Sequence, residues 1–216
     1  LLIHLKTKGG THNTLDSDEM FFLAHRIDKE TSGILVLAKN SEACANIVAQ
    51  FAERKTKKKY LAIVRGICPP EFEVNEAMNR ARNSRVALKM ECMPESEGGL
   101  SASTVFRRLD VAGDFSLVEA IPKTGRQHQI RVHAERAGYP LLGDKLYGVD
   151  EDFALLFYER DRLTPEAEAR LLHPRHALHS AGLSFTHPVS GKTMEFESPL
   201  PQDLRDFFEG QRLKGR

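Results

Sequence analysis

The amino-acid sequence predicts a mixed α+β fold, in which the strands of a largely antiparallel sheet carry helices on their faces. The class rests on a β-branched run at 34–38, an alternating segment at 60–66, and two strand-like runs at 101–109 and 115–121. With 216 residues and 41% hydrophobic side chains the chain can build a real core. We therefore expect one domain, which spans residues 1–216.

The run Ile34–Ala38 is typical of a strand that is buried on both faces. Ser41 follows as a predicted helix N-cap. One face of the helix after it carries apolar side chains at helical spacing, namely Cys44, Ile47, Val48 and Phe51. The sequence thus predicts a strand followed by a helix that packs on it.

The stretch His25–Gly33 precedes this strand and holds a histidine, an arginine and Asp28 within four residues, then a Thr-Ser-Gly turn. Turns that are anchored on a strand end commonly display catalytic groups, because their backbone is fixed while their side chains can meet a ligand. An aspartate at this place can also cap the turn through Thr31 or Ser32. The spacing alone leaves both roles open.

A basic cluster, formed by Lys55, Lys57, Lys58 and Lys59, leads into the alternating segment Tyr60–Gly66, which predicts a strand. The lysines are either a solvated turn or a set of phosphate contacts. Residues 67–100 give no clear pattern, and Arg80, Arg82 and Arg85 are candidates there for a loop that grips RNA.

The runs 101–109 and 115–121 predict an antiparallel hairpin through Gly113 and Asp114. Lys123–Arg126 then opens a predicted helix at 127–137, whose amide groups and dipole can bind an anion such as a phosphate. A buried stripe on this helix consists of Ile130, Ala134 and Ala137. Arg131 lies beside the stripe, and a guanidinium shielded from water needs a carboxylate partner.

The last third of the chain contains an acidic stretch at 150–161, a predicted helix at 164–172, strands near 178–185 and 193–197, and a terminal helix at 201–210. His173, His176 and His179 are three residues apart, a spacing that raises the question of a metal site. Pro174 disfavours a helix there and no acidic or cysteine ligand is suitably spaced, so ordinary packing is the preferred interpretation.

The net charge of +1 is unevenly spread, since residues 1–89 hold 15 Lys/Arg against 10 Asp/Glu. Such an excess is expected where one face meets a polyanion, although a solvated surface also explains it. Three widely spaced cysteines favour a reducing compartment. Without a signal-peptide pattern or an apolar run of about 20 residues, we expect a cytoplasmic protein. No glycine-rich nucleotide motif predicts a cofactor.

Four motifs in order resemble those of the RluA-type pseudouridine synthases. His25-Arg26-Ile27-Asp28 with Thr31-Ser32-Gly33 resembles the family signature, with isoleucine in place of the commoner leucine. The others are Lys59–Gly66, Pro122–His133, and Gly143-Asp144 with Tyr147-Gly148. The resemblance extends from His25 to about Pro201, so that it covers most of the chain.

The resemblance implies the isomerisation of uridine to pseudouridine in RNA, without cofactor or metal, by a bent sheet with an active-site cleft across its middle. It implies that Asp28 is the catalytic carboxylate, that Arg131 is its ion-pair partner, and that Tyr60 lies against the target uracil and takes part in proton transfer at C5. A core aromatic is the other interpretation of Tyr60. Whether Asp28 attacks the ribose or opens an elimination route stays undecided.

The expected RNA contacts are His25 and Arg26, which stand beside Asp28, and, further along the chain, Lys57, Lys58, Lys123, Arg126 and His128. The resemblance implies that Arg26 inserts into the RNA stack where the flipped base has left. The family implies 23S ribosomal RNA as the substrate, with transfer RNA as second choice, and we expect a monomer. Because the chain starts at Leu1, we expect a fragment that lacks an N-terminal strand with a Lys-Pro motif and any accessory RNA-binding domain. The alternatives are a non-catalytic RNA-binding assembly protein and a metal-dependent RNA hydrolase.

Overall fold

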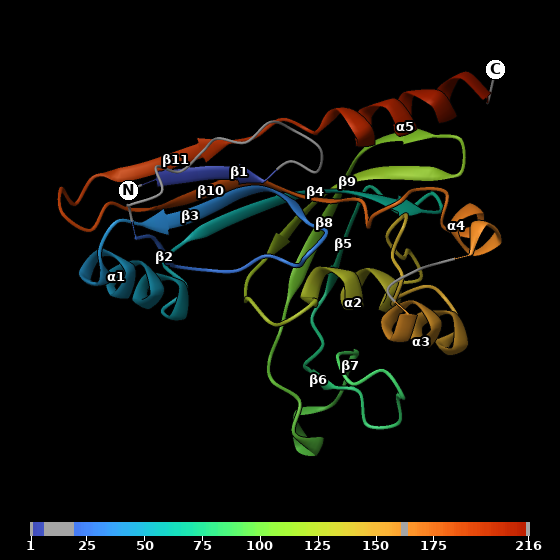
Figure 1. Cartoon of the computed structure of the whole chain (residues 1–216), viewed down its shortest axis with the longest axis horizontal. Coiled ribbons are helices and arrows are strands. Elements are labelled where there is room, and N and C mark those ends of the chain that lie inside the picture. The colour runs from blue at the N-terminus through green and yellow to red at the C-terminus, as the bar shows by residue number, and fades with distance from the viewer. Residues whose placement is uncertain (1, 7–19, 161–163, 215–216) are drawn as a thin grey trace. The chain divides into compact units, whose positions relative to one another are not determined.

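The computed structural model describes residues 2–6, 20–160 and 164–214 (Figure 1). The chain divides into two compact units. Unit 1 comprises Leu1–Tyr60 and His179–Pro201, and unit 2 comprises Leu61–Leu178 and Gln202–Arg216. Each unit is described by itself. Whether the chain acts as the one domain that we expect stays a prediction.

Unit 1 is built on strand β3 (Ser32–Ala38), which is the predicted β-branched strand and is almost wholly buried. It pairs antiparallel with β1 (Leu2–Lys6) and β2 (Phe22–Leu23) and parallel with β10 (Leu178–Thr186). Strand β11 (Thr193–Glu197) pairs antiparallel with β10. Within the described residues, β3 thus has a parallel neighbour in β10 and antiparallel neighbours in β1 and β2.

Helix α1 (Ser41–Ala52) follows β3 and packs beside β2 and β3, as the sequence predicts (Figure 1). Its N-cap is Asn40 and not Ser41, because the Asn40 side chain accepts a hydrogen bond from the backbone N–H of Ala43 at 2.8 Å. Ile47 is buried, whereas Val48 is 45% exposed and does not belong to the buried face.

Strand β4 (Lys57–Arg65) starts in unit 1 and continues into unit 2. It includes Lys57–Lys59, so the interpretation of these lysines as a turn is wrong. The Lys59 ammonium pairs with Glu197 at 2.7 Å, and its alkyl chain lies against Gly182, where an added Cβ would come within 2.9 Å of Lys59. Cross-strand contacts of this kind extend β4 through the basic cluster.

In unit 2 the second half of β4 neighbours β9 (Phe115–Pro122), which forms the predicted hairpin with β8 (Thr104–Ala112). Strand β5 (Glu71–Val74) pairs antiparallel with β8. A separate hairpin-like pair, β6 (Met78–Arg80) and β7 (Met90–Cys92), lies in the segment that gave no clear sequence pattern.

The helices of unit 2 are α2 (Gln129–Arg136), α3 (Glu151–Arg160), α4 (Pro165–Leu171) and α5 (Gln202–Lys214), with a 3-10 turn at Glu95–Glu97. Helices α2 and α5 both pack against the β8–β9 hairpin (Figure 1). Helix α3 occupies the acidic stretch, where the sequence analysis predicted no helix. The Asp150 carboxylate caps it by accepting from the Phe153 N–H at 2.8 Å.

These elements confirm the predicted α+β class with mostly antiparallel strands. The bend of the sheet and the cleft across its middle concern the arrangement of both units, and they stay predictions. Among the described helices, none combines the length and apolar character that a membrane crossing requires. The described cysteines, Cys44, Cys68 and Cys92, are free thiols.

Candidate active site

Asp28 lies on a tight turn at the entrance of β3, where the backbone carbonyl of Asp28 accepts from the Thr31 N–H at 3.0 Å. Its side chain is half-buried, whereas Thr31 and Ser32 are buried. Gly33 then adopts φ +107°, and an added Cβ would lie 2.2 Å from the Ser180 carbonyl oxygen. Because only glycine fits there, β3 and β10 approach closely and the turn that displays Asp28 is held in place.

Tyr60 belongs to the same unit, and its hydroxyl group interacts electrostatically with the carboxylate of Asp28. Burial, together with the Asp28 carboxylate, raises the pKa of Tyr60 to about 12, although a hydrogen bond with the Ser180 side chain acts in the opposite direction. At neutral pH the phenol is therefore protonated. Unit 1 thus brings the predicted residues Asp28 and Tyr60 together.

Ser180 is a contact that sequence reasoning missed. It sits on β10 opposite Gly33, more than a hundred residues along the chain from Asp28. Nothing in the local pattern of β10 distinguishes Ser180 from other buried strand residues. The sheet order, in which β10 lies between β3 and β4, brings Ser180 next to Tyr60 on β4.

A buried series of hydrogen bonds connects β3, β10 and the residue that follows β11. Ser32 Oγ lies 2.9 Å from His179 Nδ1, and His179 Nε2 lies 3.1 Å from Ser198 Oγ. His179 therefore ties β3 to the end of β11, as a packed histidine would. In the described part of the chain, no group of three or more His, Cys, Asp or Glu side chains is arranged to hold a metal ion.

His25, predicted as an RNA contact, is engaged inside unit 1. Its Nε2 accepts from the Val36 N–H at 3.0 Å, and its ring stacks on Phe51 with centroids 4.7 Å apart. Burial and the charge of Lys58 lower the pKa of His25 to about 4. The imidazole is neutral at physiological pH, so that it offers RNA no positive charge.

The other predicted RNA contacts of unit 1 differ in exposure. Arg26 and Lys57 are exposed, whereas Lys58 is half-buried. Burial and the charge of Arg54 lower the pKa of Lys58. Arg26 and Lys57 are thus better placed than Lys58 to meet a phosphate in solution.

Unit 2 contains Arg131, which is buried on α2 and forms an ion pair with buried Asp144. Arg131 Nε donates to Asp144 Oδ2 at 2.7 Å, and Nη2 donates to Oδ1 at 2.8 Å. Burial by itself would raise the pKa of Asp144, but the Arg131 guanidinium holds it at about 2. The carboxylate partner that a shielded Arg131 requires is thus present within the unit.

Asp144 belongs to the Gly143-Asp144 motif, from which no individual role for its side chain was predicted. The Gly-Asp pair followed by Tyr-Gly was the signal that could have found it. The predicted pair of Arg131 with Asp28 joins residues of different units and stays a prediction. Inside unit 2, Arg131 contacts Asp144 and the ring of Tyr147.

His128 precedes α2 with φ +56°, a left-handed conformation that is unusual for a residue with a side chain. Its Nδ1 lies 2.9 Å from the hydroxyl of buried Tyr147, and the same hydroxyl accepts from the Met90 N–H at 3.0 Å. The helix therefore begins at Gln129 and not at 127. Tyr147 fixes the predicted RNA contact His128.

The predicted anion site at Lys123–Arg126 is largely occupied by internal bonds. The backbone N–H of Lys123 donates to Ser103 O at 2.9 Å, and that of Arg126 donates to Gln129 Oε1 at 3.0 Å. The Lys123 ammonium pairs with Glu73 at 2.7 Å. These amides are not available to a phosphate, so any contact there falls to the side chains.

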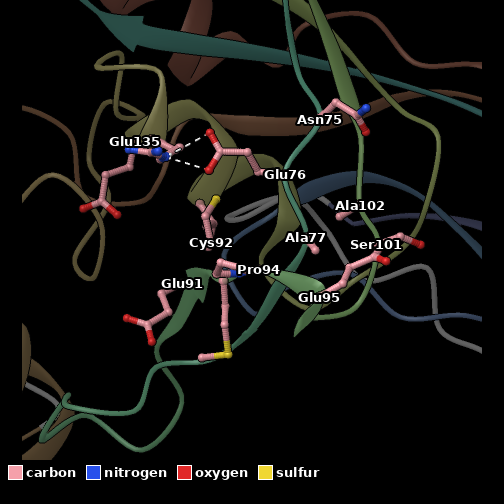
Figure 2. A pocket seen from close by; sticks show the side chains of 13 residues that line it. Asn75, Glu76, Ala77, Glu91, Cys92, Pro94, Glu95, Ser101, Ala102 and Glu135 are labelled. Carbon is pink, nitrogen blue, oxygen red and sulfur yellow. Dashed lines mark hydrogen bonds and ion pairs between the residues drawn. The ribbon is translucent and has the colours of Figure 1, made fainter. Parts of the chain in front are cut away.

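A cavity of about 690 Å³ lies beside α2 and the β6–β7 pair (Figure 2). Four glutamates line it, and one of them, Glu76, accepts two hydrogen bonds from Arg136 Nε at 3.0 and 2.8 Å. None of the predicted site residues is among its lining residues. Its acidic wall would repel a phosphate backbone, so the cavity is not the predicted RNA site.

The chain is similar to proteins of one family. The family model described as RNA pseudouridylate synthase matches residues 4–136. An uncharacterized RNA pseudouridine synthase of Chloroflexus aurantiacus is 39% identical over 183 residues, covering 85% of this chain and 51% of that protein. The ribosomal large subunit pseudouridine synthase D of Zymomonas mobilis is 37% identical over 195 residues, covering 90% of this chain and 57% of its own length. The chain thus spans little more than half the length of these relatives.

Solved structures agree in fold. The human RNA pseudouridylate synthase domain containing 4 has a TM-score of 0.69 at 24% identity, covering 89% of this chain and 76% of its own. The human RNA pseudouridylate synthase domain containing 1 has a TM-score of 0.65 at 26% identity, with coverages of 89% and 80%.

Proposed function

Because this chain belongs to the RNA pseudouridylate synthase family, we propose that it isomerises uridine to pseudouridine in RNA, with Asp28 as the catalytic carboxylate. In this reaction the N1–C1′ bond of the nucleotide breaks and a C5–C1′ bond forms, while C5 loses a proton and N1 gains one. No electrons are exchanged with a cofactor. The observation that supports the proposal most is the family match over residues 4–136, which includes Asp28, Tyr60 and Arg131.

Asp28 suits this role because of how unit 1 holds it. The close β3–β10 approach at Gly33 fixes the turn, and the half-buried side chain is not sealed from a ligand. A carboxylate that must act at a sugar carbon needs both a fixed position and access. The neighbouring Tyr60 supplies a neutral hydroxyl and an aromatic face on which a base can stack.

Tyr60 is assigned a place beside the reacting base. With a pKa of about 12 it is a hydrogen-bond donor at neutral pH, and it acts as a base only when substrate binding or the reaction lowers that pKa. Arg131, as the guanidinium partner of Asp28 in the reacting complex, completes the proposed set. Its charge would stabilise the ionised carboxylate.

The proposed substrate is 23S ribosomal RNA of the large subunit, and the proposed compartment is the cytoplasm. The naming of the Zymomonas mobilis relative as a ribosomal large subunit enzyme supports this choice. Exposed Arg26 and Lys57 are the proposed phosphate or stack contacts of unit 1. Arg126 and His128 are the corresponding contacts of unit 2, and the chain is proposed to act as a monomer.

The test is carbodiimide primer extension on ribosomal and transfer RNA from cells with and without the gene. The proposal expects one or more stops in large-subunit RNA that disappear with the gene and return with the wild-type copy. A copy with Asp28→Asn should not restore them, whereas a copy with the matched surface change Asp206→Asn should. An unchanged pseudouridine profile in both RNA classes would contradict the function, and a stop lost only from transfer RNA would reassign the substrate.

A further inference from the structure

The carboxylate of Asp144 accepts four hydrogen bonds, one at Oδ2 and three at Oδ1. Besides the two bonds from Arg131, its Oδ1 accepts from the backbone N–H of Leu146 at 2.9 Å and from that of Tyr147 at 3.1 Å. The side chain is 0% exposed. A carboxylate with four donors in a closed site cannot rotate without breaking several bonds at once.

The loop that carries Asp144 is itself clamped to a distant segment of unit 2. Gly143 has φ +71°, and an added Cβ would lie 2.1 Å from the Arg175 carbonyl oxygen. The Lys145 ammonium donates to the carbonyl of Pro174 at 2.6 Å. Residues on both sides of Asp144 are therefore fixed to the same stretch of backbone.

The guanidinium of Arg131 is also bounded by an aromatic ring. Its Cζ lies 4.9 Å from the ring centroid of Tyr147, three residues after Asp144. A cation over a ring face is attracted to it, and the contact limits tilting of the guanidinium plane. Asp144 and Tyr147 thus constrain Arg131 in the plane and out of it.

We propose that Asp144 is a positioning residue that acts through Arg131. Asp144 accepts hydrogen bonds from Nε and Nη2, on one edge of the Arg131 guanidinium. It thereby fixes the directions of the other three N–H bonds of that group. The inference rests on the proposed function, in which Arg131 serves the reacting carboxylate. A guanidinium that is rotated by even a small angle would meet that carboxylate in the wrong place.

A matched control exists in the same unit. Asp203 pairs with buried Arg175 in the same side-on manner, with Nε at 2.7 Å and Nη2 at 3.1 Å. No predicted site residue takes part in this pair. Asp144→Asn and Asp203→Asn each remove one charge from a side-on arginine–carboxylate pair, although the Asp144 side chain is 0% exposed and that of Asp203 is 42% exposed. The two rates are therefore compared on folded protein, where a difference in stability does not enter.

The first experiment measures single-turnover pseudouridine formation by the full chain on an unmodified 23S ribosomal RNA transcript, below the melting temperature of each variant. We expect Asp144→Asn to lose roughly 10- to 100-fold in rate with little change in RNA affinity, and Asp203→Asn to keep the wild-type rate. Equal rates for wild type and Asp144→Asn would overturn the inference. Equal losses in both variants would also overturn it, because they would indicate a general structural effect.

A double-mutant cycle that combines Asp144→Asn with Arg131→Lys tests whether Asp144 acts through Arg131. If it does, the Arg131→Lys/Asp144→Asn variant is no slower than Arg131→Lys alone. Independent, multiplicative losses would contradict the inference. Asp144→Glu serves if Asp144→Asn does not fold, since it keeps the charge and displaces the carboxylate by one methylene; wild-type turnover by a folded Asp144→Glu would overturn the inference.

A structural readout separates this inference from the proposed function. In an NMR spectrum of arginine side chains, the Nε–H of Arg131, assigned by its loss in Arg131→Lys, should be protected from exchange in the wild type and in Asp203→Asn. It should lose protection in Asp144→Asn, and retention there would refute the positioning role. Inactivity of the wild type on both ribosomal and transfer RNA would instead count against the proposed function, while the resonance would still report on Asp144.

Discussion

Two aspartates, Asp28 of unit 1 and Asp144 of unit 2, are held in opposite ways. Asp28 sits on a turn with its side chain half-buried, and its fixed element is the backbone around it. Asp144 is fully buried, and its fixed element is the carboxylate, which accepts four hydrogen bonds. A reacting carboxylate must be accessible to its substrate, whereas a carboxylate that orients another group must be held by hydrogen bonds.

The same contrast extends to their neighbours. Around Asp28 the phenol of Tyr60 is neutral and ionises only at high pH, since its pKa is about 12. Around Asp144 the partner is a permanently charged guanidinium. Replacing Asp28 should therefore change chemistry more than stability, and replacing Asp144 should change both.

The largest expected difference is in stability. Asp144→Asn leaves a buried guanidinium without its counter-charge, and we expect it to lower the free energy of unfolding by about 3 kcal/mol. Asp28→Asn, on a half-buried turn, should lower it by less than about 1 kcal/mol. Urea denaturation followed by circular dichroism measures both, and equal losses would remove the distinction between the two sites.

Tyr60→Phe is expected to have the next largest effect. It keeps the ring and removes the hydroxyl, so it should lower the single-turnover rate by about 100-fold if that hydroxyl takes part in proton transfer. RNA affinity should hardly change. Ser180→Ala is the companion variant, because it removes the hydrogen bond to the phenol. A Tyr60→Phe enzyme with the wild-type rate would show that only the ring is used.

Mild acid should weaken the fold because several buried histidines are neutral in the folded state. Burial is the largest cause that lowers the pKa of His25 to about 4. Burial also lowers the pKa values of His133, His173 and His176. The unfolded state therefore binds more protons below pH 6.5, and stability falls as the pH drops from 6.5 towards 4. From His25 alone we expect a loss of about 2 kcal/mol between pH 7 and pH 5, and the other buried histidines add to it in the same direction.

Urea denaturation at the two pH values measures this loss. In His25→Gln, about one proton fewer should be taken up on unfolding, so the free energy of unfolding should depend less steeply on pH. A wild type that is equally stable at pH 5 and pH 7 would contradict the assignment of neutral buried histidines.

The smallest expected difference is between two exposed lysines, in how much each contributes to the salt dependence of RNA affinity. Lys57 lies at the start of β4, whereas Lys123 is already paired with Glu73 at 2.7 Å. If both units meet RNA, Lys57→Ala should lower the slope of log affinity against log salt by about 1, and Lys123→Ala should lower it by less. Filter binding of the same transcript between 50 and 200 mM salt would give the two slopes, and a steeper change for Lys123→Ala would reverse the ranking.

The sequence carried much of this arrangement wherever the signal was local. The β-branched run gave β3, the turn at Gly113 gave the β8–β9 hairpin, and the ordered motifs pointed to Asp28 and Tyr60. Exposed faces were less certain. Val48 fits the helical period of α1 yet is 45% exposed, because a period does not say how wide the covering surface is.

The contacts that depend on distant segments were not predictable in the same way. Arg131 was expected to need a carboxylate, but hydrophobic periodicity cannot tell which loop supplies it, and Asp144 emerged only from the fold. Similarly, the Lys123–Arg126 turn has the composition of an anion site, yet Gln129 and Ser103 accept two of its amide protons. Side-chain satisfaction of a backbone is a tertiary property that composition does not encode.

In the proposed reaction Asp28 acts at the sugar, and Tyr60 and Arg131 assist it. The most direct test compares wild type, Asp28→Asn and Asp206→Asn in single-turnover reactions on an unmodified 23S ribosomal RNA transcript, with pseudouridine quantified by nucleoside mass spectrometry. We predict that Asp28→Asn forms no detectable pseudouridine while it keeps the melting temperature and RNA affinity of the wild type. Pseudouridine formation by folded Asp28→Asn at a rate close to that of the wild type would contradict the account.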